Sequence, residues 1–468
     1  MKVPFEFAGQ SGEYQSTQFG KEITRNMYMV KSETSGKVAA VVFPGLKAFG
    51  TGTGQSRGAH VMNGVRYLIN ATTLFSESST KIRVSLGTIA GTDRAIFSDD
   101  GTNLMIVANN TIYRYSTSSG AVSTVTQSVV TNPSSITYIN QQFLISGDDQ
   151  KFAVSDVDDP TTWNALNFDY EKTNPDSLLR VYAYKQLVYM LGNKSIPTWR
   201  NTGTGNPPFS RQESSLVNVG IAGKYAIAET SKYLYFLSDD KRPFQSAGAV
   251  GRPINTSGIS YIIEGLSTVS DCVCSSFIWK GQTFVMFKFP TDGVCLLYSE
   301  ENNVWTELNS GTEADVRNSW YGEDACLCYG KVLVTDYRNG NTYELDEQTF
   351  TDNGDTRLWV KSLPTITGNS INAPGRRVLT KYMQLEMQKG VGTIATSNPV
   401  IICQWSNDGG EVYGTQQNVE IGKMGDHHRL VRFDQFANGY EVKARVMGSD
   451  PVEICIWGGH YEVRDGGY

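Results

Sequence analysis

The stretch DDGTNLMIVA, residues 99–108, is followed two residues later by TIYRYS, residues 111–116. Aspartate, glycine and asparagine open the first stretch. An apolar run, LMIVA, follows, and the second stretch mixes apolar and aromatic residues with polar ones, as strands do. A turn followed by two such runs predicts a pair of antiparallel strands. A small sheet of this kind cannot bury both of its faces alone, so the fold depends on whether the unit repeats.

The unit does repeat along the middle of the chain. Related turn-plus-strand stretches are MNGVRYLIN (62–70), INQQFLISG (139–147), YKQLVYMLG (184–192), SKYLYFLSD (231–239), WKGQTFVMFK (279–288) and CYGKVLVTD (328–336). Their spacing is roughly 37 to 50 residues, which is the period of propeller blades. Blades stacked around an axis bury each other's faces. We therefore predict an all-β chain with a β-propeller of six or seven blades, both numbers being open because ring closure can merge the first and last units.

Two parts of the chain fall outside this repeat. Residues 1–58 have weak periodicity and many Gly, Ser and Thr, which predicts an extended N-terminal segment ordered by neighbouring subunits. Residues 59–356 form the propeller, and residues 357–468 form a C-terminal β-rich module. The expected strands of that module are longer than those of the repeat: 380–388, 398–406, 427–436, 440–448 and 452–464. Five such strands predict an antiparallel, sandwich-like module.

Helical periodicity is nearly absent. The best helical candidate is TEADVR, residues 312–317. The Gly- and Pro-containing stretch LPTITGNSINAPGRR, residues 363–377, is either the connection into the C-terminal module or a loop that reaches toward another subunit.

The composition excludes some classes of function. Only 19% of the residues are charged and the net charge is −6, so the chain lacks the basic footprint of a protein that wraps nucleic acid. A mildly acidic wall past which nucleic acid slides is compatible with this charge. The first residues contain no apolar signal region, and no run approaches the roughly 18 apolar residues of a membrane span. Without a secretion signal, the seven cysteines are expected to be reduced, buried thiols.

The most enzyme-like motif lies in the C-terminal module. Residues Ser406 to Tyr413, SNDGGEVY, fit the S-x-D-x-G-x-x-aromatic "Asp box" of sialidase-type propellers. Ser and Asp side chains hydrogen-bond nearby backbone amides, and Gly409 and Gly410 allow positive φ, so the motif builds a hairpin turn. This box lies away from the catalytic centre in sialidases. We therefore predict a structural hairpin with Tyr413 packed beneath it.

No other motif predicts an active site, a cofactor site or a metal site. A glycosidase needs two carboxyls that face each other, but Asp158-Asp159 and Asp239-Asp240 are expected in solvated turns. His427 and His428 open an expected strand and would point to opposite faces. The remaining candidates are Cys272 with Cys274, Cys326 with Cys328, and the Gly-rich stretch GTGTGQSRG at 50–58. The cysteines lack the C-x₂-C spacing of zinc knuckles, and the Gly-rich stretch lacks the Lys-Ser/Thr of a P-loop.

Several phrases, taken in order, resemble a known family. They are TRNMYMV (24–30), FPGLKAFGT (43–51), GQSRGAHVMNGVRYLINATTLF (54–75), DPTTWNALNF (159–168), IPTWRNTGTGNPPFSR (196–211) and QWSNDGGEVYG (404–414). Together they resemble the packaged-DNA stabilisation proteins, or tail hub (nozzle) proteins, of short-tailed bacteriophages. The resemblance spans nearly the whole chain.

This resemblance implies a structural virion protein with no enzymatic residues and no cofactor. Such proteins form a ring, typically a homohexamer, below the portal-adaptor (head-to-tail connector) protein. The ring extends the channel through which genomic DNA passes at ejection, helps to retain packaged DNA, and anchors the tail needle or plug and the tailspikes or receptor-binding proteins. The expected location is the virion tail, assembled in the host cytoplasm, with no membrane span.

Two alternatives remain at this point. A propeller glycosidase or carbohydrate-binding module acting on host surface polysaccharide predicts a carboxylate pair and an aromatic platform in a central pocket. A generic propeller scaffold in a cellular complex shares the fold and differs only in its context.

Overall fold

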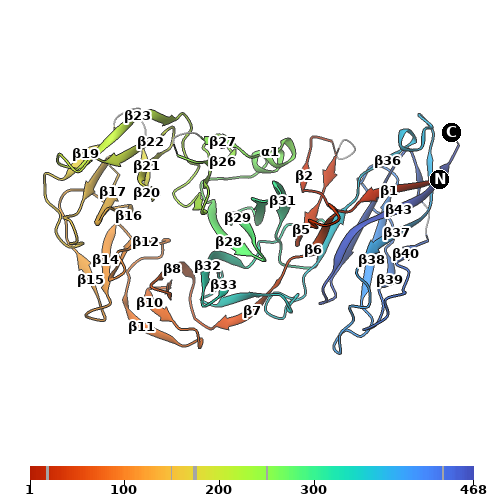
Figure 1. The fold of residues 1–468 in the computed structure, drawn as a ribbon, viewed down its shortest axis with the longest axis horizontal. Coiled ribbons are helices and arrows are strands. Elements are labelled where there is room, and N and C mark those ends of the chain that lie inside the picture. Colours follow the sequence, from red (N-terminus) through yellow and green to blue (C-terminus); the bar gives the residue numbers. More distant parts are fainter. Residues whose placement is uncertain (17–19, 149, 172–176, 249–250, 435–436, 468) are drawn as a thin grey trace.

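In the computed structural model, a ring of β-blades lies beside a second β module (Figure 1). The structure describes residues 1–16, 20–148, 150–171, 177–248, 251–434 and 437–467. Five blades consist of four consecutive antiparallel strands. These strands are β8 (Ser56–Met62), β9 (Val65–Asn70), β10 (Thr73–Glu77) and β11 (Arg83–Thr88); β12 (Ile96–Asp99), β13 (Asn103–Ala108), β14 (Thr111–Ser116) and β15 (Ala121–Val125); β16 (Ser135–Ile139), β17 (Gln142–Ser146), β18 (Lys151–Val154) and β19 (Phe168–Tyr170); β20 (Leu178–Tyr184), β21 (Leu187–Gly192), β22 (Ile196–Asn201) and β23 (Phe209–Val217); β24 (Ile227–Glu229), β25 (Leu234–Leu237), β26 (Pro243–Ser246) and β27 (Gly251–Pro253).

The last two blades each involve another part of the chain. One consists of β28 (Val273–Trp279), β29 (Gln282–Phe289), β30 (Val294–Ser299) and β31 (Val304–Glu307), and its sheet continues into the second module. The other consists of β32 (Gly322–Cys328), β33 (Lys331–Asp336), β34 (Thr342–Asp346) and the N-terminal strand β7 (Gly45–Gly50). The six separate four-stranded sheets and the β28–β31 unit make seven blades.

Hydrophobic clusters between successive blades hold the ring together. Each of seven clusters combines side chains of two adjacent blades, such as Ile69 with Leu104, and Tyr235 with Val285. The ring closes where Phe49 and Leu333 of the last blade pack against Val61 of the first. Radial stacking of this kind leaves only short blade edges exposed. The predicted all-β propeller is confirmed.

Tight turns set the strand register within the blades. Asn63-Gly64, Lys280-Gly281 and Tyr329-Gly330 each connect the first two strands of a blade, and both residues of each pair have positive φ. Two residues in this conformation form the type I′ turn whose twist matches that of paired strands. The polar turns that reveal the repeat in the sequence are therefore the inner hairpins of the blades.

The second module is a sandwich of two sheets that share one core. The first sheet has the order β40-β37-β43-β6-β5, with β1 paired to β43 and β41 to β37; the second sheet includes the path β35-β42-β38-β39, with β36 on β42. The strands are β1 (Lys2–Glu6), β5 (Met27–Lys31), β6 (Val38–Val42), β35 (Trp359–Ser362), β36 (Ile366–Thr367), β37 (Val378–Met387), β38 (Val400–Ser406), β39 (Gln417–Glu420), β40 (Arg432–Phe433), β41 (Asn438–Gly439), β42 (Glu441–Gly448) and β43 (Cys455–Asp465). The core combines Met383 and Val463 of the first sheet with Ile401 and Val442 of the second.

The N-terminal residues pair within the chain itself. β1 pairs with β43, β6 pairs with β43 and β5, and β7 pairs with β34, so residues 1–58 are built into both modules. Both chain ends lie at the far end of the second module (Figure 1). The predicted boundary at residue 59 falls inside β8, and the described residues before it (1–16 and 20–58) form no separate extended segment. The role of neighbouring subunits in ordering this segment remains a prediction.

Four expected C-terminal strands correspond to β37, β38, β42 and β43. The expected strand at 427–436 is wrong in extent, because the described part of that stretch pairs only at β40, and residues 435–436 lie outside the described residues. β39 was not expected. In the stretch 363–377, the structure places β36 and a short 3₁₀ helix, η1 (Gly368–Ile371), inside the module.

The expected helix at 312–317 is wrong. These residues lie in a loop, where Arg25 binds the carbonyl oxygens of Ala314 and Val316, so tertiary contacts decide the backbone conformation. The helix that forms is α1 (Ser257–Glu264), capped by Thr256 and buried through Ile259, Ile262 and Ile263. The two-residue strand β2 (Gly12–Glu13) lies beside it and pairs with β3 (Lys21–Glu22). Among the described residues, no helix has both the length and the apolar character needed to cross a bilayer.

Candidate functional site

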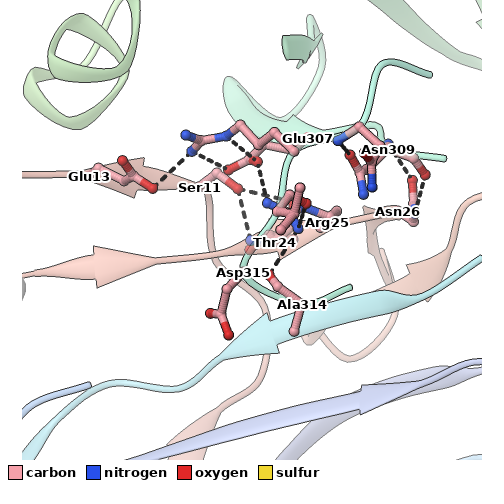
Figure 2. A network of polar contacts seen from close by, with 12 residues as sticks. Ser11, Glu13, Thr24, Arg25, Asn26, Glu307, Asn309, Ala314 and Asp315 are labelled. Carbon is pink, nitrogen blue, oxygen red and sulfur yellow. Dashed lines mark hydrogen bonds and ion pairs between the residues drawn. The ribbon is translucent and has the colours of Figure 1, made fainter. Parts of the chain in front are cut away.

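One short strand joins the propeller to the second module. β4 (Thr24–Arg25) pairs in parallel with β31 of the propeller and antiparallel with β35 of the module. The resulting ten-stranded sheet runs from β28 through β4 to β39. The residues around β4 form a network of polar contacts at this junction (Figure 2), and we describe this network as the candidate functional site.

Arg25 lies at the centre of the junction. Its Nη2 donates to Oε2 of Glu307 at 3.1 Å, and both side chains are almost fully buried. Its Nη1 donates to the carbonyl oxygens of Ala314 and Val316 at 3.0 and 3.1 Å. A guanidinium presents several donors in a fixed fork, so one side chain binds the blade end and the following loop at once.

A second arginine completes the ion-pair network. Nε of Arg317 lies 3.1 Å from Oε2 of Glu307, and its Nη2 donates to Oε1 of Glu13 at 2.9 Å. Burial alone would raise the pKa of Glu307, but Arg317 and Arg25 outweigh it and lower that pKa to about 2. Glu307 therefore stays ionised at neutral pH and holds both guanidinium groups.

Asn26 turns the chain between β4 and β5. Its φ of 54° is in the left-handed region, which asparagine tolerates better than most residues. Its Nδ2 donates to the carbonyl oxygens of Asn309 and Leu358, both at 2.8 Å, and its Oδ1 accepts from the backbone N–H of Asn309 at 2.9 Å. This one side chain connects the end of a blade to the residue that precedes β35.

Thr24 fixes the other side of β4. The backbone N–H of Thr24 donates to Oγ of Ser11 at 2.8 Å, and its hydroxyl accepts a hydrogen bond from Nζ of Lys361 at 2.9 Å. Burial lowers the pKa of Lys361 to about 8, an effect that Glu22 opposes. Thr24, Arg25 and Asn26 thus connect the propeller, the loop after β31 and the second module. This arrangement supports a rigid connection between the two modules.

The Asp box forms the predicted kind of turn. Oγ of Ser406 accepts from the backbone N–H of Gly410 at 2.9 Å, and Oδ1 of Asp408 accepts from those of Glu411 and Val412, both at 3.1 Å. Gly409 and Gly410 have φ of 76° and 106°. The ring of Tyr413 stacks against the guanidinium of Arg445 at 4.0 Å. These contacts tie the turn to its own module.

The carboxylates considered for catalysis sit in turns and bind their neighbours. Oδ1 of Asp159 accepts from the backbone N–H and hydroxyl of Thr161, and Asp240 pairs with Arg242. Hydrogen bonds from Thr161 and Thr162 lower the pKa of Asp159 to about 2. The structure does not bring these turn carboxylates together with one another.

The histidines and cysteines considered as metal ligands contact only local partners. Sγ of Cys272 lies 3.8 Å from Sγ of Cys274, and burial raises the pKa of Cys272. His60 contacts Asp99 at 2.6 Å, and His427 contacts the carbonyl oxygen of Lys389 at 3.1 Å. Across the described ranges, His, Cys, Asp and Glu side chains form no group of three that could hold a metal ion.

Sequence reasoning did not identify the junction residues. Arg25 and Glu307 are separated by 282 positions, and neither belongs to a chemical motif. The phrase TRNMYMV contains Thr24, Arg25 and Asn26, so the resemblance supplied the one signal that pointed to this site. Arg57 and Arg66, in another of those phrases, are buried as well. Arg57 donates to four carbonyl oxygens, one in the first blade (Ala71) and three in the loop that leads to the second blade (Ile89, Ala90 and Asp93).

Solved structures with a similar fold are remote in sequence. The streptogramin B lyase structure is 11% identical with a TM-score of 0.45, covering 64% of this chain and 97% of that one. U3-55K is 10% identical with a TM-score of 0.45, covering 65% of this chain and all of that one. BamB from Moraxella catarrhalis is 10% identical with a TM-score of 0.41, covering 73% and 98%. Similarities this low carry no argument about function.

Curated proteins gave no match to the chain. A family model described as "Bacteriophage P22 Gp10, beta-propeller" matches residues 1–350. This range includes the propeller, the strand β4 and both members of the Arg25–Glu307 pair. The chain therefore belongs to the phage packaged-DNA stabilisation family of bacteriophage P22 Gp10, and it is a phage structural protein.

Proposed function

We propose that this chain is the subunit of a tail hub, or nozzle, that forms a homohexameric ring below the portal-adaptor complex. The ring extends the DNA channel, helps to retain packaged DNA until ejection, and anchors the tail needle and the tailspikes. The protein acts in the virion tail after assembly in the host cytoplasm.

The observation that carries this proposal is the junction at β4. A ring that closes a pressurised head needs subunits whose two modules do not move against each other. Here one sheet is continuous across both modules, and the buried Arg25–Glu307 pair lies on the strands that join them. Breaking a buried pair by removing one partner is strongly unfavourable, so the pair resists separation of the modules.

The charge of the chain supports the role in DNA passage. With −6 per chain, six copies give a ring of roughly −36, which repels a polyanion instead of binding it. A wall of this sign lets DNA move through without sticking.

The second module offers apolar side chains for contacts with other proteins. Ile394, Met424 and Leu430 are 98%, 69% and 51% exposed. Their two loops are in contact, because the backbone N–H of Gly425 donates to the carbonyl oxygen of Gly390 at 3.3 Å. Exposed apolar side chains gathered in one place are typical of protein–protein contacts.

Assembly with the connector tests the proposal. The purified chain is examined by mass photometry and negative-stain electron microscopy, alone and with a portal-adaptor complex. We expect a six-subunit ring on the adaptor. A stable monomer that never joins the complex would contradict the proposal.

Two variants separate contacts from folding. Ile394→Asp combined with Met424→Asp should reduce assembly while the melting temperature stays unchanged, because both side chains are exposed. Arg242→Ala, which removes an exposed ion pair on the propeller, is the matched control and should assemble normally.

A further inference from the structure

A cavity of about 280 Å³ lies between the inner strands of the propeller. Its lining comes from β8, β12, β20, β24, β28 and β32, the first strands of six blades. The cavity therefore lies at the central channel of the propeller within one chain, away from the junction at β4. Its polar lining includes Arg94, Arg180, Tyr182, Tyr225 and Glu229.

One cation of this lining is fully neutralised. Nη1 of Arg94 lies 2.7 Å from Oε2 of Glu323, and its Nη2 pairs with Asp324. Its guanidinium also stacks on the ring of Tyr225 at 5.3 Å, and the Tyr225 hydroxyl donates to the backbone carbonyl oxygen of Arg94 at 2.7 Å. Arg94 and its two carboxylates thus form a closed group that needs no further anion.

Arg180 differs from Arg94. Its Nη1 donates to the carbonyl oxygen of Lys224 at 3.1 Å, and its guanidinium stacks on the ring of Tyr182 at 5.0 Å. Like the Nε of Arg94, its Nε is shielded from solvent and has no hydrogen-bond partner, so the two arginines differ in their ion pairs alone. Among the residues that the structure describes, no carboxylate oxygen forms an ion pair with it within 4.0 Å. Glu229, exposed at the same cavity, interacts with the Tyr182 hydroxyl.

A guanidinium stays charged at all ordinary pH values, so burial cannot neutralise it by loss of a proton. Buried charges in proteins are paired or hydrogen-bonded, and arginine binds carboxylate and phosphate groups through two parallel hydrogen bonds. Arg180 retains donors for such an interaction at the wall of a cavity large enough for a small molecule.

We propose that the central cavity of the propeller binds a small molecule through its oxyanion, a carboxylate or a phosphate, held by Arg180, with Tyr182 and Tyr225 in the lining of the same cavity. Aromatic rings supply apolar contact area for the rest of the ligand. This site is independent of the proposed assembly, because none of its lining residues lies in the two loops that carry Ile394 and Met424 or at the β4 junction.

Isothermal titration calorimetry on the full chain tests the site. Inorganic phosphate and glucuronate are titrated separately at pH 7 and constant ionic strength. We expect saturable binding of at least one probe. Arg180→Gln should weaken it by about tenfold or more, since a charge-assisted pair of hydrogen bonds is lost. Arg242→Gln, an exposed arginine of the same propeller, should bind as the wild type does.

A second variant guards against misfolding of Arg180→Gln. Glu229→Gln changes an exposed residue and removes a negative charge from the cavity, so it should tighten binding of the same probe. Binding of phosphate alone assigns the site to a phosphorylated ligand, and binding of glucuronate alone assigns it to a sugar acid. No saturable binding of either probe, or binding that neither variant changes, would overturn the proposal.

Discussion

Arg25 and Glu307 are register partners on the adjacent parallel strands β4 and β31, and their side chains form an ion pair of 3.1 Å that is 2% and 3% exposed. The backbone pairing of the two strands and the ion pair of the two side chains thus hold the sheet together at the same position. β4 consists of only two residues, so its few backbone hydrogen bonds need this support. The pair couples the start of the chain to the end of a blade and, through β35, to the second module.

Glu307→Gln should lower the free energy of unfolding by about 3 kcal/mol. The change keeps the shape of the side chain but leaves the buried Arg25 without its carboxylate partner, while Arg317 keeps only its ion pair with Glu13. Urea denaturation followed by tryptophan fluorescence measures the loss.

Glu420→Gln is the control for this change. Glu420 pairs with Arg429 on an exposed part of the second module, where solvent screens the interaction. Its unfolding curve should match that of the wild type. Equal curves for the two variants would mean that the buried pair contributes nothing to the junction.

The same carboxylate should make stability fall in acid. The pKa of Glu307 is about 2 in the folded protein and about 4.3 in an unfolded chain. The unfolded state therefore binds the proton first as the pH falls. The stabilisation is complete above about pH 5 and decreases progressively toward pH 2. Unfolding free energies of wild type and Glu307→Gln, measured from pH 7 to pH 3, should converge. A difference that is independent of pH would contradict this assignment.

Closure of the propeller, between its last and first blades, depends on a second buried network of ion pairs and hydrogen bonds. Oε2 and Oε1 of Glu77, in the first blade, accept from Arg66 and Arg83, and both arginines donate to Oγ1 of Thr342 in the last blade. Glu77→Gln should cost about 3 kcal/mol for the same reason as Glu307→Gln. It should also speed amide hydrogen exchange in β34 and β7, where the ring closes. Glu347→Gln, at an exposed pair with Lys280, should leave that exchange unchanged.

The propeller was predictable from the sequence because its signal is local and repeated. Each inner hairpin, such as that around Asn63-Gly64, places its turn residues next to its strand residues. The strand that completes the last blade was not predictable in this way. β7 lies about 300 residues from its partner β34, and a repeat search sees only neighbours in the chain.

The junction was not predictable for a similar reason. Glu307 looks like the polar end of a strand, and Arg25 looks like a residue of a weakly periodic segment. Their pairing appears only when the sheet brings β31 and β4 together. The error at 312–317 has the same origin, because the carbonyl oxygens of this stretch bind Arg25 instead of forming helical hydrogen bonds. The eight-residue helix α1 was missed because it is too short to show a clear period.

Lys361 should make stability rise in mild alkali. Burial lowers its pKa to about 8 in the folded protein, against about 10.4 for an exposed lysine. Between these values the unfolded state binds more protons, so the free energy of unfolding increases with pH. Lys361→Met removes the titrating group. From pH 7 to pH 10, the free energy of unfolding of the wild type should therefore increase relative to that of the variant. Lys381→Met, at a partly exposed lysine, should show no such shift.

Asp408→Ala should loosen the Asp-box hairpin without affecting the junction. The carboxylate accepts from two backbone N–H groups of its own turn. Without it, these N–H groups lose their acceptor, but they are partly exposed, so the free energy of unfolding should fall by only about 1 kcal/mol. Amide exchange should become faster at Glu411 and Val412, while the amides of β4 keep their protection. Val412→Ala is the matched control, because it trims an exposed side chain of the same turn and keeps the backbone N–H. A loss of protection at β4 in Asp408→Ala would show that the hairpin supports the junction, contrary to this expectation.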